Sequence, residues 1–315
     1  GAAAAAFAGL AGVRLMVLFP EGRISAVQRR FMTTTGADNI RCVAVEGDFD
    51  ACQAMVKALF ADAIFAREVA LGAVNSINFA RIAAQSVYYF VAGVALGAPE
   101  KPSAFVVPTG NFGDAYAGWA AARMGLPVSR LVVATNANAI VARALNEGVY
   151  RRGPAIATQS PAMDIQVASN FERLYFEYAD RDAGRTAAAL AAFDSRGEII
   201  LPPEMRTALA DRFSGVSVDE AATTEAMRRI WAKSSVVVDP HTAVALAAAD
   251  RIGSRDGTTV VLSTAHPAKF PEAVAAAGLT PDQDRVTALA ALPERLDRLP
   301  ANLEAVKAYV RGWHA

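Results

Sequence analysis

Apolar and polar residues follow two different periods along the first 150 residues of the chain. Short apolar runs predict buried strands at Val13–Phe19, Ile40–Val45, Ala104–Val107 and Leu131–Ala134. Apolar residues at helical spacing predict helices between them at 25–34, 50–60, 77–96, 114–124 and 139–146. The helix over 77–96 is apolar on all sides, so we expect it to be deeply buried. This alternation predicts an α/β fold, with parallel sheets covered by helices on both faces.

The pattern changes after residue 151. Helical segments follow one another from 151 to 234 without a predicted strand, so we expect an all-helical insertion over about 151–234. Alternation resumes with a strand over 236–238, a helix over 242–251 and a strand over 259–262. At the start of the insertion, Arg151 and Arg152 form a small basic spot that we interpret as surface.

The composition narrows the class of protein. Of the 315 residues, 53% are hydrophobic and 20% are charged, which is typical of a globular protein of one large or two modest domains. Lys plus Arg and Asp plus Glu each number 31, so no overall field favours nucleic acid or an acidic membrane. The longest apolar window, 86–99, is shorter than the roughly 20 residues that span a bilayer. Cys42 and Cys52 have no metal-ligand or disulfide pattern and predict buried free thiols in a cytoplasmic protein.

The sequence Pro-Thr-Gly-Asn-Phe-Gly-Asp at 108–114 stands where a predicted strand gives way to a helix. Its two glycines expose backbone, and the helix that follows offers unpaired N–H groups and a partial positive charge. Ligands of open α/β sheets bind at the carboxyl ends of strands, so one interpretation is an anion site. The other interpretation is a tight turn in which Asp114 caps the helix.

Three further segments place polar side chains at element ends. Val260–Phe270 brings hydroxyls, His266 and Lys269 to a strand end, where the alternative is a capped helix with a solvated lysine. At 236–245 we favour a structural Asp-Pro turn in which His241 has its hydrogen bonds satisfied. The amides and the serine at the start of Asn75–Gln85 either cap the following helix or face a ligand.

Taken in chain order, these motifs resemble the threonine synthases of bacteria and fungi. The similar segments are PTGNFGD, NSINFARIAAQ, DPHTAVA and STAHPAKF, together with LFPEGRISAVQRRFMTT and VEGDFDACQAMV nearer the start. That family consists of pyridoxal-phosphate enzymes of fold type II, built like the tryptophan synthase β subunit. Its members convert O-phosphohomoserine and water into threonine and phosphate by a β,γ-replacement. The resemblance implies a small domain over 1–74 and a large cofactor-binding domain over 75–315, with the active site in the cleft between them.

The resemblance also implies the roles of individual residues. Six residues would contact pyridoxal phosphate: Thr109, Gly110, Asn111, Phe112, Gly113 and Thr264. Thr264 would face the pyridine nitrogen with a neutral hydroxyl. Five residues would bind the substrate: Asn75, Ser76, Asn78, His266 and Lys269, the last two at the phosphate that leaves.

The family's Schiff-base lysine and its Ser-Gly-Asp-Thr-Gly loop precede the position that Gly1 matches. No lysine precedes Lys57, which lies in a helix that matches another family segment. We therefore expect the lysine upstream of Gly1, and we expect residues 1–315 alone to be inactive. The implied enzyme is cytoplasmic and monomeric or homodimeric, acts on a small molecule, and needs no metal, nucleic acid or membrane. The alternatives are a sibling pyridoxal-phosphate lyase, such as a serine or threonine dehydratase, and a non-catalytic phosphate-binding protein.

Overall fold

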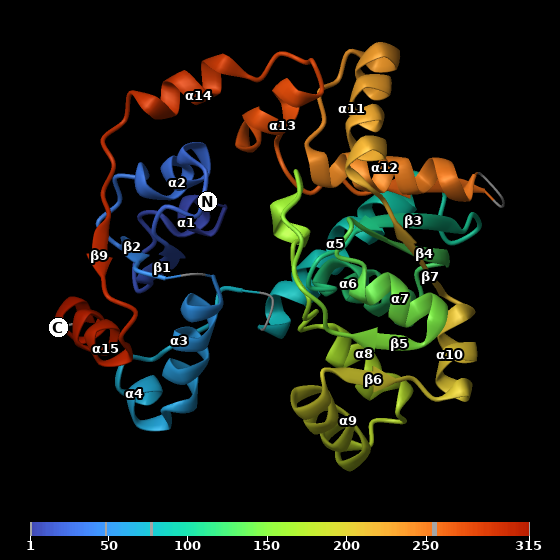
Figure 1. The fold of residues 1–315 in the computed structure, drawn as a ribbon, viewed down its shortest axis with the longest axis horizontal. Helices are drawn as coiled ribbons and strands as arrows, with labels where there is room; N and C mark the ends of the chain where they lie inside the picture. Colours follow the sequence, from blue (N-terminus) through green and yellow to red (C-terminus); the bar gives the residue numbers. More distant parts are fainter. Residues whose placement is uncertain (1, 48, 76–77, 254–256, 315) are drawn as a thin grey trace. The chain divides into compact units, whose positions relative to one another are not determined.

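The computed structural model describes residues 2–47, 49–75, 78–253 and 257–314, and its elements are labelled in Figure 1. The chain divides into two compact units. Unit 1 consists of Gly1–Val74 and Asp282–Ala315, and unit 2 consists of Asn75–Pro281. The boundary between Val74 and Asn75 falls where the sequence analysis placed the end of the small domain.

Unit 1 is built on a three-stranded parallel sheet with the order β1-β2-β9. The strands are β1 (Leu15–Pro20), β2 (Ile40–Val45) and β9 (Asp297–Leu299). Alternate side chains of β2 enter different cores. Val43 and Val45 pack with α3 (Phe49–Ala61), α4 (Ala63–Glu68) and α15 (Leu303–His314). Cys42 and Ala44 pack with α1 (Ala2–Phe7) and α2 (Ala26–Thr33), so helices cover both faces.

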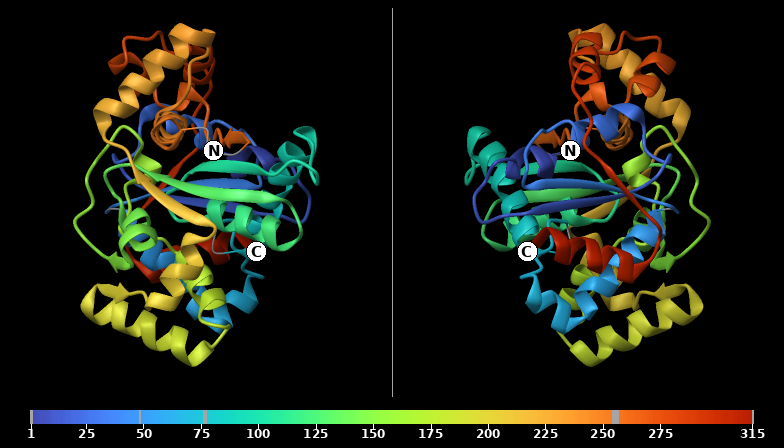
Figure 2. Two further views of the ribbon diagram at one scale, coloured as in Figure 1. Left: turned by 90° about the vertical axis from the view of Figure 1, so that its right-hand side faces the viewer. Right: turned by 90° about the vertical axis from the view of Figure 1, so that its left-hand side faces the viewer.

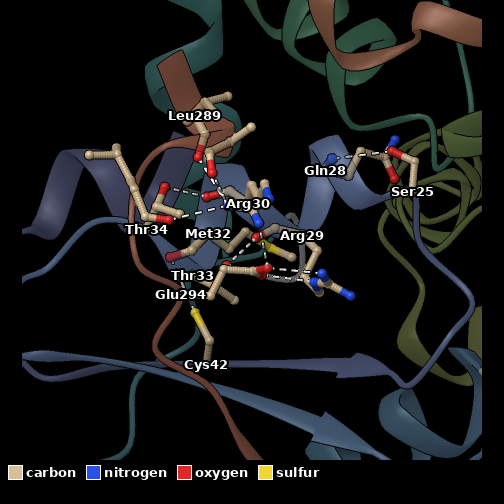
Figure 3. Close-up of polar contacts among 12 residues, drawn as sticks. Ser25, Gln28, Arg29, Arg30, Met32, Thr33, Thr34, Cys42, Leu289 and Glu294 are labelled. Atoms are coloured by element: carbon tan, nitrogen blue, oxygen red, sulfur yellow. Dashed lines mark hydrogen bonds and ion pairs between the residues drawn. The ribbon is translucent and has the colours of Figure 1, made fainter. Parts of the chain in front are cut away.

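The C-terminal segment belongs to unit 1, whereas the domain prediction placed it with unit 2. The segment contributes β9, which pairs with β2. Its Glu294 also contacts α2 (Figure 3): the Oε2 atom of Glu294 accepts hydrogen bonds from Arg29 Nε and from Thr33 Oγ1, each 2.8 Å long. The hydrogen bonds from Arg29 lower the pKa of Glu294. Arg30 also donates to the carbonyl of Leu289 in α14 (Gln283–Ala290) at 3.1 Å. These contacts span more than 250 residues of sequence, so local patterns could not reveal them.

Unit 2 is built on a four-stranded parallel sheet with the order β7-β4-β3-β8. Its strands are β3 (Ser103–Pro108), β4 (Val128–Thr135), β7 (Phe213–Ser217) and β8 (Thr258–Val261). One face packs on α5 (Phe79–Ala95), α6 (Gly113–Arg123) and α7 (Ile140–Glu147). The other face packs on α11 (Glu220–Ser234) and α12 (Pro240–Ile252), drawn in orange in Figures 1 and 2. The predicted α/β architecture is confirmed, and the carboxyl ends of β3, β4 and β8 meet at one edge.

The prediction of an all-helical segment over 151–234 was wrong. This region holds the helices α8 (Phe171–Tyr178), α9 (Ala183–Arg196) and α10 (Pro203–Ala210), but also two strands. β6 (Glu198–Ile200) pairs antiparallel with β5 (Val149–Arg151), and β7 forms an edge of the main sheet. The sequence of β7, Phe-Ser-Gly-Val-Ser, hid the strand because its glycine weakens the pattern. Gly215 is required because a Cβ there would lie 2.5 Å from Ala142 Cα. The expected strand over 236–238 does not form, because these residues have no regular secondary structure and lead into α12.

Helix α5 is buried along one side only. Ile82 and Tyr89 are fully buried, as its apolar sequence predicts, but Val87, Val91 and Val94 are 59–64% exposed. Uniform hydrophobicity therefore overestimated its burial. Among the described residues, no helix combines the length and the hydrophobicity needed to cross a bilayer.

Candidate functional site

Residues 109–113, which we call the anion turn, connect β3 to α6. Phe112 adopts a left-handed conformation with φ of 65°, which is uncommon for a residue other than glycine. Its side chain is 1% exposed, and its ring lies 5.6 Å from that of Phe171 and 5.9 Å from that of Phe213. The ring of Phe112 therefore holds the turn to the hydrophobic core, and this packing offsets the conformational strain.

The anion turn keeps several backbone donors unused. Within the described residues, the N–H groups of Gly110, Phe112, Asp114 and Ala115 meet no hydrogen-bond acceptor. The N–H of Gly113 donates to Asn111 Oδ1 at 2.9 Å. These free donors stand at the N-terminus of an 11-residue helix, where the helix dipole adds partial positive charge. Such an array of N–H groups is suited to a phosphate or carboxylate.

The protein's own packing requires glycine at position 110 and leaves little room for a side chain at position 113. A Cβ at position 110 would lie 2.7 Å from the carbonyl oxygen of Ala162, in the short helix η1 (Pro161–Met163). A Cβ at position 113 would lie 3.1 Å from Asn111 Oδ1 and 3.2 Å from Ile82 Cδ1. Thr109 is also buried, and its hydroxyl donates to the carbonyl of Val107 at 2.7 Å. The turn is therefore packed from beneath and held in one shape.

Asp114 does not cap α6, in contrast to one interpretation of the sequence. Its carboxylate is turned toward α5, where Oδ1 accepts hydrogen bonds from the hydroxyls of Tyr88 and Tyr89. Burial raises the pKa of Asp114, while the two tyrosine hydrogen bonds oppose that effect. The N–H group of Gly113, in the first turn of the helix, instead donates to the side chain of Asn111, one residue before the N-cap position.

The segment that follows β8 lies beside the anion turn because β8 is the neighbour of β3. Thr264 and His266 are exposed there, and Lys269 is partly buried at the end of η2 (Pro267–Lys269). His266 caps η2 by accepting a hydrogen bond of 3.2 Å from the N–H of Ala268 on Nδ1. The sheet therefore brings the two predicted phosphate-binding segments to adjacent strand ends.

The interpretation of His241 as a satisfied structural histidine is confirmed. Its Nδ1 lies 2.8 Å from Oδ1 of Asp239, which is fully buried and caps α12. Its Nε2 accepts a hydrogen bond of 3.2 Å from the N–H of Ala162. The proton of the neutral ring is therefore on Nδ1. Through Ala162, the imidazole contacts the same peptide segment that approaches Gly110.

A buried polar cluster follows β4, and the sequence analysis missed it. The carboxylate of Asp164 accepts hydrogen bonds from Asn136 Nδ2 at 2.8 Å, from Asn138 Nδ2 at 3.1 Å, and from the hydroxyl and N–H of Thr158 at 2.6 and 2.9 Å. Asn136 and Asn138 are 0% and 3% exposed. The available signal was the Asn-Ala-Asn sequence at a strand end, but its partner lies 26 to 28 residues away.

This cluster fixes a loop over 154–170, which we call the strap. The strap contains η1, and its last residue, Asn170, donates its N–H to the carbonyl of Asn111 at 3.0 Å. Ala162 of the strap approaches the neighbouring residue of the turn, Gly110. Two separate parts of the strap therefore contact adjacent residues of the anion turn.

The predicted substrate residues at the start of α5 have different positions. Asn78 caps the helix, because its Oδ1 accepts a hydrogen bond of 3.0 Å from the N–H of Ala80. Asn75 precedes it and is exposed, and Ser76 lies outside the described residues. Arg81 stands in the first turn of α5, and the sequence analysis did not consider it although it is the cation of this motif.

Two family profiles match the chain. The one described as "Pyridoxal-phosphate dependent enzyme" matches residues 1–196, and the one described as "Threonine synthase, C-terminal" matches residues 242–310. Among curated proteins, the threonine synthase of Pseudomonas aeruginosa is 45% identical over 302 residues, covering 95% of this chain and 64% of that protein. The threonine synthase of Saccharomyces cerevisiae is 41% identical over 294 residues, which cover 86% of this chain and 57% of that protein. The chain thus spans about three fifths of the length of these relatives.

Solved structures of threonine synthases are also similar to this chain. The structure of the pyridoxal-phosphate-bound threonine synthase from Brucella melitensis superposes with a TM-score of 0.92 at 41% identity, covering 99% of this chain and 68% of that chain. The threonine synthase from yeast superposes with a TM-score of 0.85 at 35% identity, covering 97% and 66%.

Proposed function

This chain belongs to the threonine synthase family of pyridoxal-phosphate-dependent enzymes, and we propose that the protein itself converts O-phosphohomoserine and water into threonine and phosphate. The observation that carries this proposal is the anion turn. The N–H groups of Gly110 and Phe112 in the turn, and of Asp114 and Ala115 at the start of α6, meet no acceptor among the described residues, and the turn lies at the carboxyl end of the sheet in unit 2.

The anion turn fits the phosphate group of pyridoxal phosphate. A phosphate accepts several hydrogen bonds, and the turn and the first residues of α6 together offer four backbone N–H groups without requiring a charged side chain. The carboxylate of Asp114 would repel an anion, but it is directed to the tyrosines of α5. We assign the phosphate contacts to Thr109–Gly113, chiefly through their backbone because the Thr109 hydroxyl and the Phe112 ring have partners inside the protein.

When bound, pyridoxal phosphate supplies an electron sink for the carbon atoms of an amino-acid substrate. We assign Thr264 to the pyridine nitrogen, where a neutral hydroxyl does not force protonation of the ring. We assign Asn75, Ser76 and Asn78 to the substrate side.

The phosphate that leaves the substrate gains charge as its C–O bond breaks. A positive group at that position stabilises the transition state more than the ground state. We therefore assign Lys269 and His266 to this phosphate, with Arg81 as a further candidate because guanidinium groups bind phosphate in bidentate fashion. Lys269 follows β8, next to the strand that leads to the anion turn.

We also propose that the protein works in the cytoplasm as a monomer or homodimer. Cys42 and Cys52 are buried free thiols, and burial raises the pKa of Cys42 to about 11, which disfavours the reactive thiolate. Two buried thiols outside any disulfide suit a reducing compartment but do not require one.

Protein expressed from the complete reading frame tests the function. We expect it to bind pyridoxal phosphate and to release phosphate and threonine from O-phosphohomoserine. Formation of 2-oxo acids from serine or threonine without use of the phosphorylated substrate would instead identify a dehydratase. Absence of cofactor binding would support a non-catalytic role.

The leaving-phosphate assignment predicts that Lys269→Ala lowers kcat/KM by about 2–4 kcal/mol, as expected for one charged contact at a developing anion. Pyridoxal-phosphate content should stay unchanged, because the anion turn retains its donors. Lys233→Ala, at an exposed position in α11, is the matched control. Wild-type kinetics for Lys269→Ala, or loss of cofactor from it, would overturn the assignment and make Arg81→Ala the next variant to measure.

A further inference from the structure

A pocket of unit 2 lies beside α9 and the β5–β6 pair, and its volume is about 710 Å³. Four arginines line it, namely Arg151, Arg152, Arg185 and Arg196, and the carboxylate of Glu198 is the acidic side chain among its lining residues. The formal charge of the lining is therefore +3, in a protein whose total charge is zero. We call this cavity the basic pocket. Arg151 and Arg152 are the residues whose sequence we interpreted as ordinary surface.

The positive charge of the basic pocket is only partly neutralised. Arg151 pairs with Glu198, and Arg185 pairs at 3.1 Å with Glu204, whose side chain is 70% exposed. Arg152 and Arg196 form no ion pair within the described parts of the chain. The guanidinium of Arg152 lies 4.8 Å above the ring of Phe193, which holds the cation in place without cancelling its charge.

Helix electrostatics do not account for this cluster. Arg196 is in the last turn of α9, where a cation favourably opposes the negative end of the helix dipole. Arg185 is in the first turn of the same helix, where a cation is disfavoured. Arg151 and Arg152 come from the end of β5 and the residue after it. Separate elements thus bring like charges to one cavity, and an anion bound there would reduce their mutual repulsion.

One wall of the basic pocket is apolar. It is formed by Ala188, Ala189 and Ala192 of α9 and by Ile199 and Ile200 of β6, and Ile200 is 59% exposed. Tyr175 also lines the cavity. A ligand that fills it would therefore present several negative groups to the arginines and a flat or apolar body to the wall.

We propose that the basic pocket binds an organic polyphosphate, meaning a molecule with adjacent phosphate groups joined to an aromatic body. Guanidinium groups suit phosphates because they donate paired hydrogen bonds and stay charged at all physiological pH values. Exposed ion pairs such as Arg185–Glu204 contribute little stability and exchange readily for a ligand. The proposal is independent of the reaction at the anion turn.

Because the basic pocket adjoins the strap, ligand binding there should change the rate of backbone amide hydrogen exchange. Arg152 is followed by Gly153, whose N–H donates to Gln166 Oε1 at 3.2 Å, and Gln166 Nε2 donates to Asn138 Oδ1 at 3.1 Å. Ordering Arg151 and Arg152 would therefore slow amide hydrogen exchange in the adjoining start of the strap and in β6.

The test uses protein expressed from the complete reading frame and saturated with pyridoxal phosphate, so that the anion turn is occupied. ATP is titrated by calorimetry at low and at physiological ionic strength. We expect saturable binding that weakens with salt, with inorganic pyrophosphate binding about 10-fold more weakly because it does not use the apolar wall. Hydrogen exchange should slow at 151–166 and 198–200. Equal affinity for pyrophosphate would overturn an organic ligand, and protection elsewhere would overturn the location.

Charge-reversed variants complete the test. Arg152→Glu/Arg196→Glu should lower ATP affinity about 30-fold or more, because two phosphate contacts become repulsive. The control Arg67→Glu/Arg123→Glu changes the net charge equally at exposed positions outside the pocket. If reversal prevents folding, Arg152→Gln/Arg196→Gln replaces it. Equal affinity in the pocket and control variants, or no saturable ATP binding to the wild-type protein, would overturn the proposal.

Discussion

The turns that follow β3 and β4 lie at the same edge of one sheet, and both place asparagines beside small residues. After β3, the side chain of Asn111 accepts a hydrogen bond from the N–H of Gly113. The N–H groups of four nearby residues meet no acceptor in the described structure. After β4, Asn136 and Asn138 form hydrogen bonds with each other and with the strap, and Asp164 accepts the donors that remain.

The difference lies in the balance of donors and acceptors. A strand end with surplus donors can bind an anion, whereas one with matched donors and acceptors forms a rigid internal joint. The two turns are also linked, because the strap fixed by Asp164 packs against Gly110 and Asn111. The joint after β4 therefore holds the turn after β3 in one shape, and a fixed shape favours binding because less ordering is needed.

The largest effect is expected from Asp164→Ala. Removing this carboxylate takes away an acceptor that Asn136, Asn138 and Thr158 share in a buried network, so we expect the free energy of unfolding to fall by about 2–4 kcal/mol. Chemical denaturation measures the change.

The control for Asp164→Ala is Asp182→Ala, which removes an exposed helix cap of α9 and should reduce stability by about 1 kcal/mol. Hydrogen exchange should also speed up at the anion turn in the Asp164 variant alone. Equal behaviour of the two variants would mean that the strap does not support the turn.

The contrast between the two turns marks the limit of what the sequence could predict. Strand–helix alternation and the polar strand ends after β3 and β8 could be read from periodicity and residue type, because these are local properties. Whether a donor finds an acceptor depends on residues such as Asp164, which lies 28 positions from Asn136. No local pattern contains that information.

The same limit explains the other differences. Glu294 joins the C-terminal segment to Arg29 across 265 residues, so the domain boundary after residue 281 could not be predicted from composition. The strand β7 is short and contains Gly215, and its pairing with β4 is what makes it a strand. The sequence of α5 predicted burial but could not indicate which of its faces is covered in the described structure.

The second prediction concerns the close approach at Gly110. Gly110→Ala would place Cβ 2.7 Å from the carbonyl oxygen of Ala162, so either the strap or the turn must shift. Overpacking of this kind destabilises by about 1–3 kcal/mol. We expect pyridoxal-phosphate affinity to fall about 10-fold or more, measured by equilibrium titration. Gly72→Ala is the control, because a Cβ there meets nothing within 4 Å. Unchanged affinity in the Gly110 variant would show that the two segments move apart without consequence.

The third prediction separates the hydrogen bond of His241 from its volume. His241→Phe removes the acceptor for the N–H of Ala162 and the donor to Asp239, and we expect a loss of about 1–2 kcal/mol of stability. His241→Gln keeps a polar side chain able to accept from Ala162 and should recover part of the loss. Thermal unfolding gives the stability, and hydrogen exchange at Ala162 reports the bond itself. If the Phe variant is the more stable of the two, packing against Phe270 rather than hydrogen bonding explains the residue.

The smallest effect concerns pH and Asp114, the acidic residue of the anion turn's helix. Burial raises the pKa of Asp114, so the folded state holds a proton that the unfolded state releases at lower pH. Stability therefore falls as the pH rises from the pKa of the unfolded state, 3.8, through the higher pKa of the folded state, and the loss persists above that pKa.

Asp114→Asn should remove this part of the pH dependence because the amide does not ionise. Its oxygen can still accept a hydrogen bond from a tyrosine. The neutral side chain should also slightly strengthen phosphate binding at the turn. Denaturation of both proteins across the acidic range gives the comparison, and parallel curves would show that Asp114 keeps an ordinary pKa in the folded protein.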